Sequence, residues 1–197
     1  PNIISKQIEL EKAFKQMTLE KGMPYHEVLG FTPADVDSPV VQASLRQISH
    51  YFLEELEEAS SAVTRTAEVE ELIDSLHFLA IYHINLGLSE FPVSAHINIG
   101  MQPTEMSNLF RPWLYLSSYL KNKPWKQTLK PVEPGFWEAL ADFNYLYFNH
   151  LLWIMGNMQI VEVEYNRINA RNLQRIVEGR CYPLKMTPHG WKRLCIG

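Results

Sequence analysis

Two short acidic motifs that lie close together in the sequence constrain the fold of this chain more than any other feature. They read EELEE, starting at Glu54, and ELID, starting at Glu71. Residues three apart lie on the same face of a helix, which places Glu55 beside Glu58 and Glu71 beside Asp74. The segment that links the motifs is short and β-branched, and so short a link joins two helices as an antiparallel hairpin.

The predicted hairpin brings four carboxylates face to face. Counted outward from the link at about residues 64–66, Glu58 lies level with Glu71. Glu55 lies level with Asp74, about one turn further out. Facing carboxylates repel one another unless a positive charge lies between them. A hard divalent cation that prefers oxygen ligands, Mg²⁺ first, supplies that charge.

Asp74 is the strongest part of this prediction. It stands in the largely apolar run LIDSLHFLAIYHINL, where an unpaired carboxylate would be costly and needs a partner, a metal or a raised pKa. The neighbouring Glu57 and Glu70 are interpreted instead as members of a solvated helix face.

The remainder of the chain also shows helical spacing without a clear strand pattern. We therefore predict an all-α helical bundle that forms a single domain over residues 1–197, with an extra helical insertion at about 90–160. Helices are expected at about residues 4–19, 39–63, 67–86, 136–158 and 159–178. The tail from Tyr182 to Gly197 is expected to be loop-like. The helix at 136–158 is apolar on nearly all sides, which predicts burial in the core or at a subunit contact, with a nucleobase platform as the alternative.

The bulk composition argues against several classes of protein. A net charge of −4 without a basic run argues against binding to nucleic acid. No apolar stretch reaches the length of a membrane span, and the sequence begins without the apolar core of a signal peptide. The two cysteines, Cys181 and Cys195, do not suggest a disulfide scaffold. We therefore expect a cytoplasmic protein that does not associate with a membrane.

A polar stripe of Asn169, Asn172 and Arg175 runs along one edge of the last predicted helix. Such a stripe usually faces solvent, but amide donors and a guanidinium fork are also the groups that bind phosphate or sugar. The glycine patterns of dinucleotide-binding and P-loop proteins are absent, which argues against NAD-type and Walker-type sites.

Taken together, the motifs resemble those of the all-α nucleotide pyrophosphohydrolases, the superfamily of MazG-like enzymes, dimeric dUTPases and phage dCTPase-dUTPases. EExxE, a short link and ExxD on the next helix form the signature of that superfamily. The run ELIDxxHF, and an LR dipeptide ahead of Tyr51, are most similar to the phage dCTPase-dUTPases. Residues 169–179 are similar to the NAxNxxRxxxG nucleotide-binding segment of the family. The resemblance covers about residues 40–90 and 165–180.

This resemblance implies a bundle of the all-α NTP pyrophosphohydrolase type that acts as a Mg²⁺-dependent hydrolase. It would convert a deoxynucleoside triphosphate and water to the monophosphate and pyrophosphate, with dUTP, dCTP or both as substrates. Two or more Mg²⁺ ions per site, with Mn²⁺ as a substitute, would neutralise the phosphates and activate the water. We assign as metal ligands Glu55, Glu58, Glu71 and Asp74. Glu55 is also assigned as the group that accepts the proton of the attacking water.

The other candidate residues receive binding and supporting roles. Phosphate or sugar binding is assigned to Asn169, Asn172 and Arg175. Gln16 would read a base edge through its amide, and Glu54 is an outer acidic group. His77, one turn beyond Asp74, would support the ligands through hydrogen bonds rather than bind the metal, because Mg²⁺ prefers oxygen.

Other interpretations stay open. The N-terminal part of the pattern also resembles MazG relatives with purine substrates, so a purine or modified dNTP is an alternative. A second alternative is a non-catalytic interaction module that binds a nucleotide, although such a module has little reason to keep four repelling carboxylates. A di-iron bundle usually needs Glu-x-x-His on two helices, and only Asp74-x-x-His77 is present.

The expected partners are a nucleotide and a second copy of the chain. A two-helix hairpin and an aromatic helix leave apolar surface, which predicts a homo-oligomer, most simply a homodimer. If the chain is phage-encoded, as the resemblance implies, the host cytoplasm is its expected location.

Overall fold

The computed structural model describes residues 3–93, 105–121 and 131–179, together with the backbone of two strands at 181–187 and 190–195. Helices dominate these residues, which confirms the predicted all-α class for the body of the protein. The elements are α1 (Ile3–Glu20), the 3-10 helix η1 (Pro33–Asp37), α2 (Pro39–Ser61), α3 (Arg65–Asn85), α4 (Ser107–Ser118), α5 (Phe136–Met155) and α6 (Met158–Val177). None of the described helices combines the length and apolar character needed to span a bilayer.

The C-terminal tail differs from the prediction. It forms an antiparallel pair of strands, β1 (Cys181–Thr187) and β2 (Gly190–Cys195), so the expectation of a loop was wrong. Pro183 lies within β1, and both strands of a two-stranded ribbon are edge strands, where proline is tolerated. The pairing register shifts between Tyr182 and Lys185, around that proline.

Local signals explain where the helices begin and end. Ser38 precedes Pro39 at the start of α2, and the Thr64 side chain accepts a hydrogen bond of 3.2 Å from the Ala67 amide at the start of α3. Gly87 ends α3 with a φ of +70°, and a Cβ there would lie 2.5 Å from the Phe31 carbonyl oxygen. Residues 62–64 alone separate α2 from α3. This short link produces the antiparallel hairpin that the sequence predicts.

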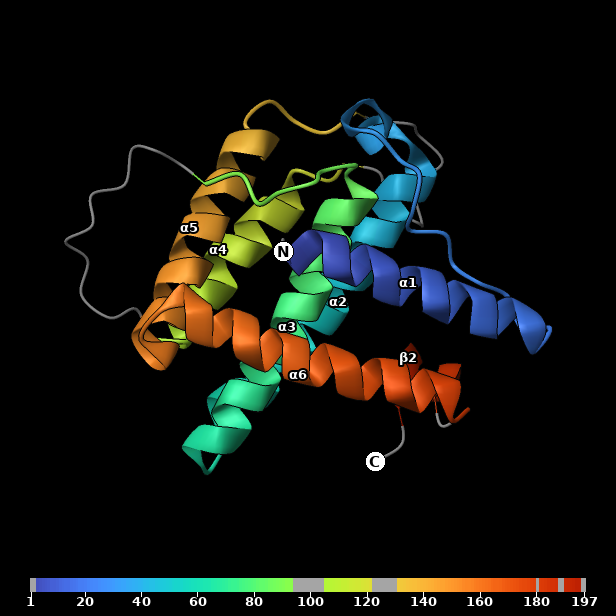
Figure 1. The fold of residues 1–197 in the computed structure, drawn as a ribbon. Helices are drawn as coiled ribbons and strands as arrows, with labels where there is room; N and C mark the ends of the chain where they lie inside the picture. Colours follow the sequence, from blue (N-terminus) through green and yellow to red (C-terminus); the bar gives the residue numbers. More distant parts are fainter. Residues whose placement is uncertain (1–2, 94–104, 122–130, 180, 188–189, 196–197) are drawn as a thin grey trace.

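The α2–α3 hairpin lies at the centre of the molecule and has helices on two sides (Figure 1). The α4–α5 pair contacts it on one side. Helices α1 and α6, which run side by side, contact α3 on the other. Helix α3 therefore has one face toward α5 and another toward α1 and α6.

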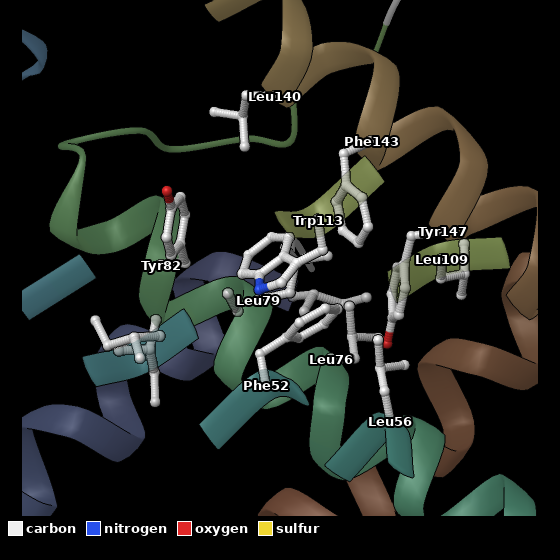
Figure 2. Packing of buried hydrophobic residues seen from close by; sticks show 14 of the residues in the cluster. Phe52, Leu56, Leu76, Leu79, Tyr82, Leu109, Trp113, Leu140, Phe143 and Tyr147 are labelled. Carbon is white, nitrogen blue, oxygen red and sulfur yellow. The ribbon is translucent and has the colours of Figure 1, made fainter. Parts of the chain in front are cut away.

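The side toward α4 and α5 is an aromatic core (Figure 2). Phe52 of α2 lies 4.2 Å from the Trp113 ring of α4 and 5.6 Å from the Tyr147 ring of α5, measured between centroids. The Tyr147 hydroxyl donates a hydrogen bond of 2.9 Å to the Leu72 carbonyl in α3. Burying such rings is among the largest contributions to the stability of a fold, so this core fixes the hairpin in place.

The described part of the predicted insertion thus forms one side of the core. Residues 94–104 and 122–130 of the insertion lie outside the described residues. Helix α5 buries Leu140, Phe143 and Tyr147 but leaves Trp137 39% and Trp153 56% exposed. It is therefore less uniformly buried than its composition predicts. It also ends at Met155, because Gly156 has a φ of +88°.

Candidate metal centre

Three carboxylates converge on the side of the hairpin that faces away from the aromatic core. Glu55 comes from α2, and Glu71 and Asp74 come from α3. One oxygen of each lies within 4.8 Å of the others. Phe52 and Leu56 of α2 pack into the core, and Glu55 lies at the edge of that buried face, where it meets the two carboxylates of α3. Three converging oxygen donors suit a hard divalent cation such as Mg²⁺.

The electrostatics of Asp74 support a cation site. Burial, and then the negative charge of Glu71, raise the pKa of this carboxyl to about 6 against the opposing charge of Arg171. Glu70 and Arg175 add smaller effects of opposite sign. The ionised form is therefore disfavoured in the protein alone, and a cation within the group would relieve that cost.

Two of the predicted acidic residues lie apart from this group. Glu58 is exposed and does not belong to the converging set found among the described residues. Glu54 is half-buried, and its carboxylate lies 3.6 Å from Nε2 of His50. The one-turn spacing that favoured Glu58 is correct, but the hairpin places Glu58 toward solvent near the link.

The positions of Glu71 and Glu58 lead to a prediction for metal affinity. Glu71→Gln removes an oxygen from the converging group, so we expect it to weaken Mg²⁺ binding by about tenfold or more. Glu58→Gln, a matched change in the same hairpin, should weaken binding by less than about threefold. Calorimetric titration with Mg²⁺ measures both. Equal losses would restore Glu58 as a ligand.

A cavity of about 200 Å³ opens beside the carboxylates. Glu55 and Asp74 line one part of it, and Asn172 and Arg175 of α6 also line it. The structure therefore brings two residues of the predicted polar stripe to the predicted acidic group. Carboxylates beside a guanidinium and an amide can bind a cation together with the phosphate that the cation accompanies.

Two other predicted binding residues do not line this cavity. Asn169 is 5% exposed, and its amide donates a hydrogen bond of 3.5 Å to the Lys6 carbonyl, which ties α6 to α1. Gln16 is exposed on α1 and donates a hydrogen bond of 2.9 Å to Glu20. The base-reading role expected of Gln16 has no support in this position.

Two polar residues of α1 that were not predicted do line the cavity, Gln7 and Glu11. Each is 1% exposed. The Gln7 amide donates a hydrogen bond of 3.1 Å to one Glu11 oxygen, and the Tyr25 hydroxyl donates one of 3.2 Å to the other. A signal existed in the sequence, because Gln7 and Glu11 fall on the same helical face as the apolar Ile4 and Phe14.

Arg171 of α6 was also missed as a site residue. It lies close enough to lower the pKa of both Asp74 and His77, and its Nη1 lies 3.5 Å from a Glu70 oxygen. Its Nε is buried and has no hydrogen-bond partner among the described residues. Arg171 thus adds positive charge close to the three carboxylates.

His77 lines the same cavity, one turn from Asp74 on α3. Its Nδ1 lies 2.7 Å from Oε1 of Gln7, and its ring stacks on Tyr165 at a centroid distance of 4.2 Å. Burial, and then the positive charge of Arg171, lower the pKa of His77 to about 3. The imidazole is therefore neutral at physiological pH.

An adjoining cavity is mostly apolar. It shares Phe14, Phe78 and Ile81 with the first cavity and extends along the hairpin to Ile48 and Tyr51. The Tyr51 and Phe78 rings lie 5.5 Å apart between centroids. Together the two cavities offer an acidic and cationic end and an aromatic end.

Comparison with protein-family models, with curated proteins and with solved structures finds no match for this chain.

Proposed function

We propose that this protein is a cytoplasmic Mg²⁺-dependent deoxynucleoside triphosphate pyrophosphohydrolase. The observation that carries the proposal is the convergence of Glu55, Glu71 and Asp74 in a site whose cavity also contains Asn172 and Arg175. Carboxylates, a guanidinium and an amide in one cavity match a magnesium triphosphate better than they match a neutral ligand. The base would lie toward the adjoining apolar cavity, where the Tyr51 and Phe78 rings offer a stacking surface.

Each residue receives a role that follows from its chemistry. Glu55, Glu71 and Asp74 would hold the metal. Mg²⁺ bound there would neutralise phosphate charge and make water a better nucleophile. Arg175 and Asn172 bind and orient the phosphates. Attack of water on the α-phosphorus breaks its bond to the bridging oxygen of the pyrophosphate leaving group, and Glu55 accepts the proton of the water.

The choice of dUTP, dCTP or both as substrate rests on the sequence resemblance to the phage dCTPase-dUTPases. A homodimer is part of the proposal because large apolar side chains are exposed near the α2–α3 link and the α5–α6 turn. They include Val63 at 98%, Trp153 at 56% and Val163 at 62% exposure.

A panel of the common dNTPs with Mg²⁺, assayed for pyrophosphate release, tests the proposal. We expect release from at least one pyrimidine dNTP. Arg175→Gln should lower kcat/KM for that dNTP by about tenfold to a hundredfold, because a charge-assisted phosphate contact is lost. Arg167→Gln is the control, since Arg167 on the same helix pairs with Glu164 and Glu70 instead of lining the cavity. No pyrophosphate from any dNTP would refute the proposed activity.

A further inference from the structure

The tautomer of His77 is fixed by its hydrogen bonds. A carboxylate can only accept hydrogen bonds, so the Gln7 amide must direct its NH₂ toward Glu11. Its oxygen then faces His77 and Tyr165. That oxygen accepts a bond of 2.6 Å from the Tyr165 hydroxyl, and Nδ1 of His77 lies 2.7 Å from it. Nδ1 therefore carries the proton, and Nε2 carries a lone pair.

The lone pair on Nε2 is left without a partner. His77 is 6% exposed and lines the cavity, and Nε2 has no hydrogen-bond partner in the described part of the chain. A buried acceptor without a partner costs free energy that a ligand carrying a donor can recover.

His77 also lies between the two ends of the combined cavity. Along α3, Asp74 belongs to the carboxylate group, His77 follows one turn later, and Ile81 lines the apolar cavity. Helix α2 runs antiparallel to α3, so its residues follow the same order with falling numbers. Glu55 lines the acidic end, and Tyr51 lines the apolar end. A nucleotide has its phosphates, sugar and base in this order, so its sugar would lie beside His77.

We propose that Nε2 of His77 accepts a hydrogen bond from the 3′-hydroxyl of the substrate's deoxyribose, so that the site selects nucleotides that carry this hydroxyl. The inference rests on the proposed nucleotide function of the cavity. His77 acts here in substrate recognition, and no proton is transferred. A nucleotide without the hydroxyl leaves the buried acceptor unpaired, which disfavours its binding.

Dideoxynucleotides test the proposal. In the wild type, kcat/KM for a dNTP should exceed that for its 2′,3′-dideoxy counterpart by about tenfold or more. His77→Phe keeps a ring to stack on Tyr165 but removes the acceptor, so the preference should fall to within about twofold. His50→Phe, at an exposed position of α2 outside both cavities, should keep the preference. Equal use of both nucleotides by the wild type, or full preference in His77→Phe, overturns the proposal.

A second measurement requires neither turnover nor a folded variant. In ¹⁵N-histidine-labelled wild type, Nε2 of His77 should resonate as an unprotonated nitrogen. It should shift on addition of a deoxynucleoside monophosphate but not of the dideoxy form. A selective shift without hydrolysis of any dNTP would refute the proposed activity and retain the recognition role. Hydrolysis without a shift or a hydroxyl preference would retain the activity and refute the role of His77.

Discussion

Asp74→Asn is expected to reduce the Mg²⁺-dependent hydrolysis of a dNTP by about a hundredfold to a thousandfold. The substitution preserves the shape of the side chain but removes the charge that faces Glu55 and Glu71 in the converging group. The same range is expected for Glu55→Gln, which loses a ligand oxygen and the proposed proton acceptor. Initial rates of pyrophosphate release at saturating Mg²⁺ measure both effects.

Glu57→Gln is the matched control for these variants. Glu57 is exposed on the same helix as Glu55 and accepts a hydrogen bond of 3.3 Å from Ser61. Its substitution should leave the rate within about twofold of wild type. Unchanged turnover in both Asp74→Asn and Glu55→Gln would mean that the converging carboxylates do not take part in the reaction.

The hairpin was predictable because its determinants are local. The helical period, the short link and the cap at Thr64 all act within a few residues of each other, and they bring Glu55 close to Asp74. The acidic site follows from that hairpin. The apolar run around Asp74 also predicted the burial that raises its pKa.

Other parts of the site depend on contacts between distant segments. Gln7 reaches His77 and Tyr165 only because α1 and α6 pack beside the hairpin, and nothing near Gln7 in the sequence indicates those partners. The spacing of the carboxylates also did not show which one would turn to solvent, as Glu58 does. Likewise, Trp113 joins the core through contacts with Phe52 that lie far apart in the sequence.

The stability of the metal-free protein provides a test of the site that is independent of turnover. The pKa of Asp74 rises from 3.8 to about 6 in the folded state, so the folded protein holds that proton more tightly than the unfolded chain. Between these two values the folded state binds more protons, and the contribution of Asp74 to stability falls as the pH rises. Above about pH 6 Asp74 is ionised in the folded state, and the full cost of that ionised side chain to stability applies. This cost is roughly 2 kcal/mol after allowance for solvent screening.

Asp74→Asn should therefore stabilise the metal-free protein at pH 8, with a Tm about 4 to 8 °C above wild type in EDTA. At pH 4 the two proteins should melt at similar temperatures, because Asp74 is then largely protonated in the folded state. Buried His77 and His83, with pKa values lowered to about 3 and about 4, make the protein lose stability as the pH falls below 6.5. That loss is common to both proteins and cancels in the difference between them.

Mg²⁺ should reverse the order of the two proteins. Saturating Mg²⁺ at pH 8 raises the Tm of wild type through binding to the folded state, whereas the variant lacks a ligand and should gain much less. Differential scanning fluorimetry at pH 4 and pH 8, with EDTA or Mg²⁺, measures all four conditions. Equal melting temperatures in EDTA at pH 8 would contradict the cost of holding ionised Asp74 in its buried position beside Glu71. An equal gain from Mg²⁺ in both proteins would place the cation elsewhere. If the Asp74→Asn protein is more stable but inactive, the carboxylate that destabilises the fold is also the one that the reaction requires.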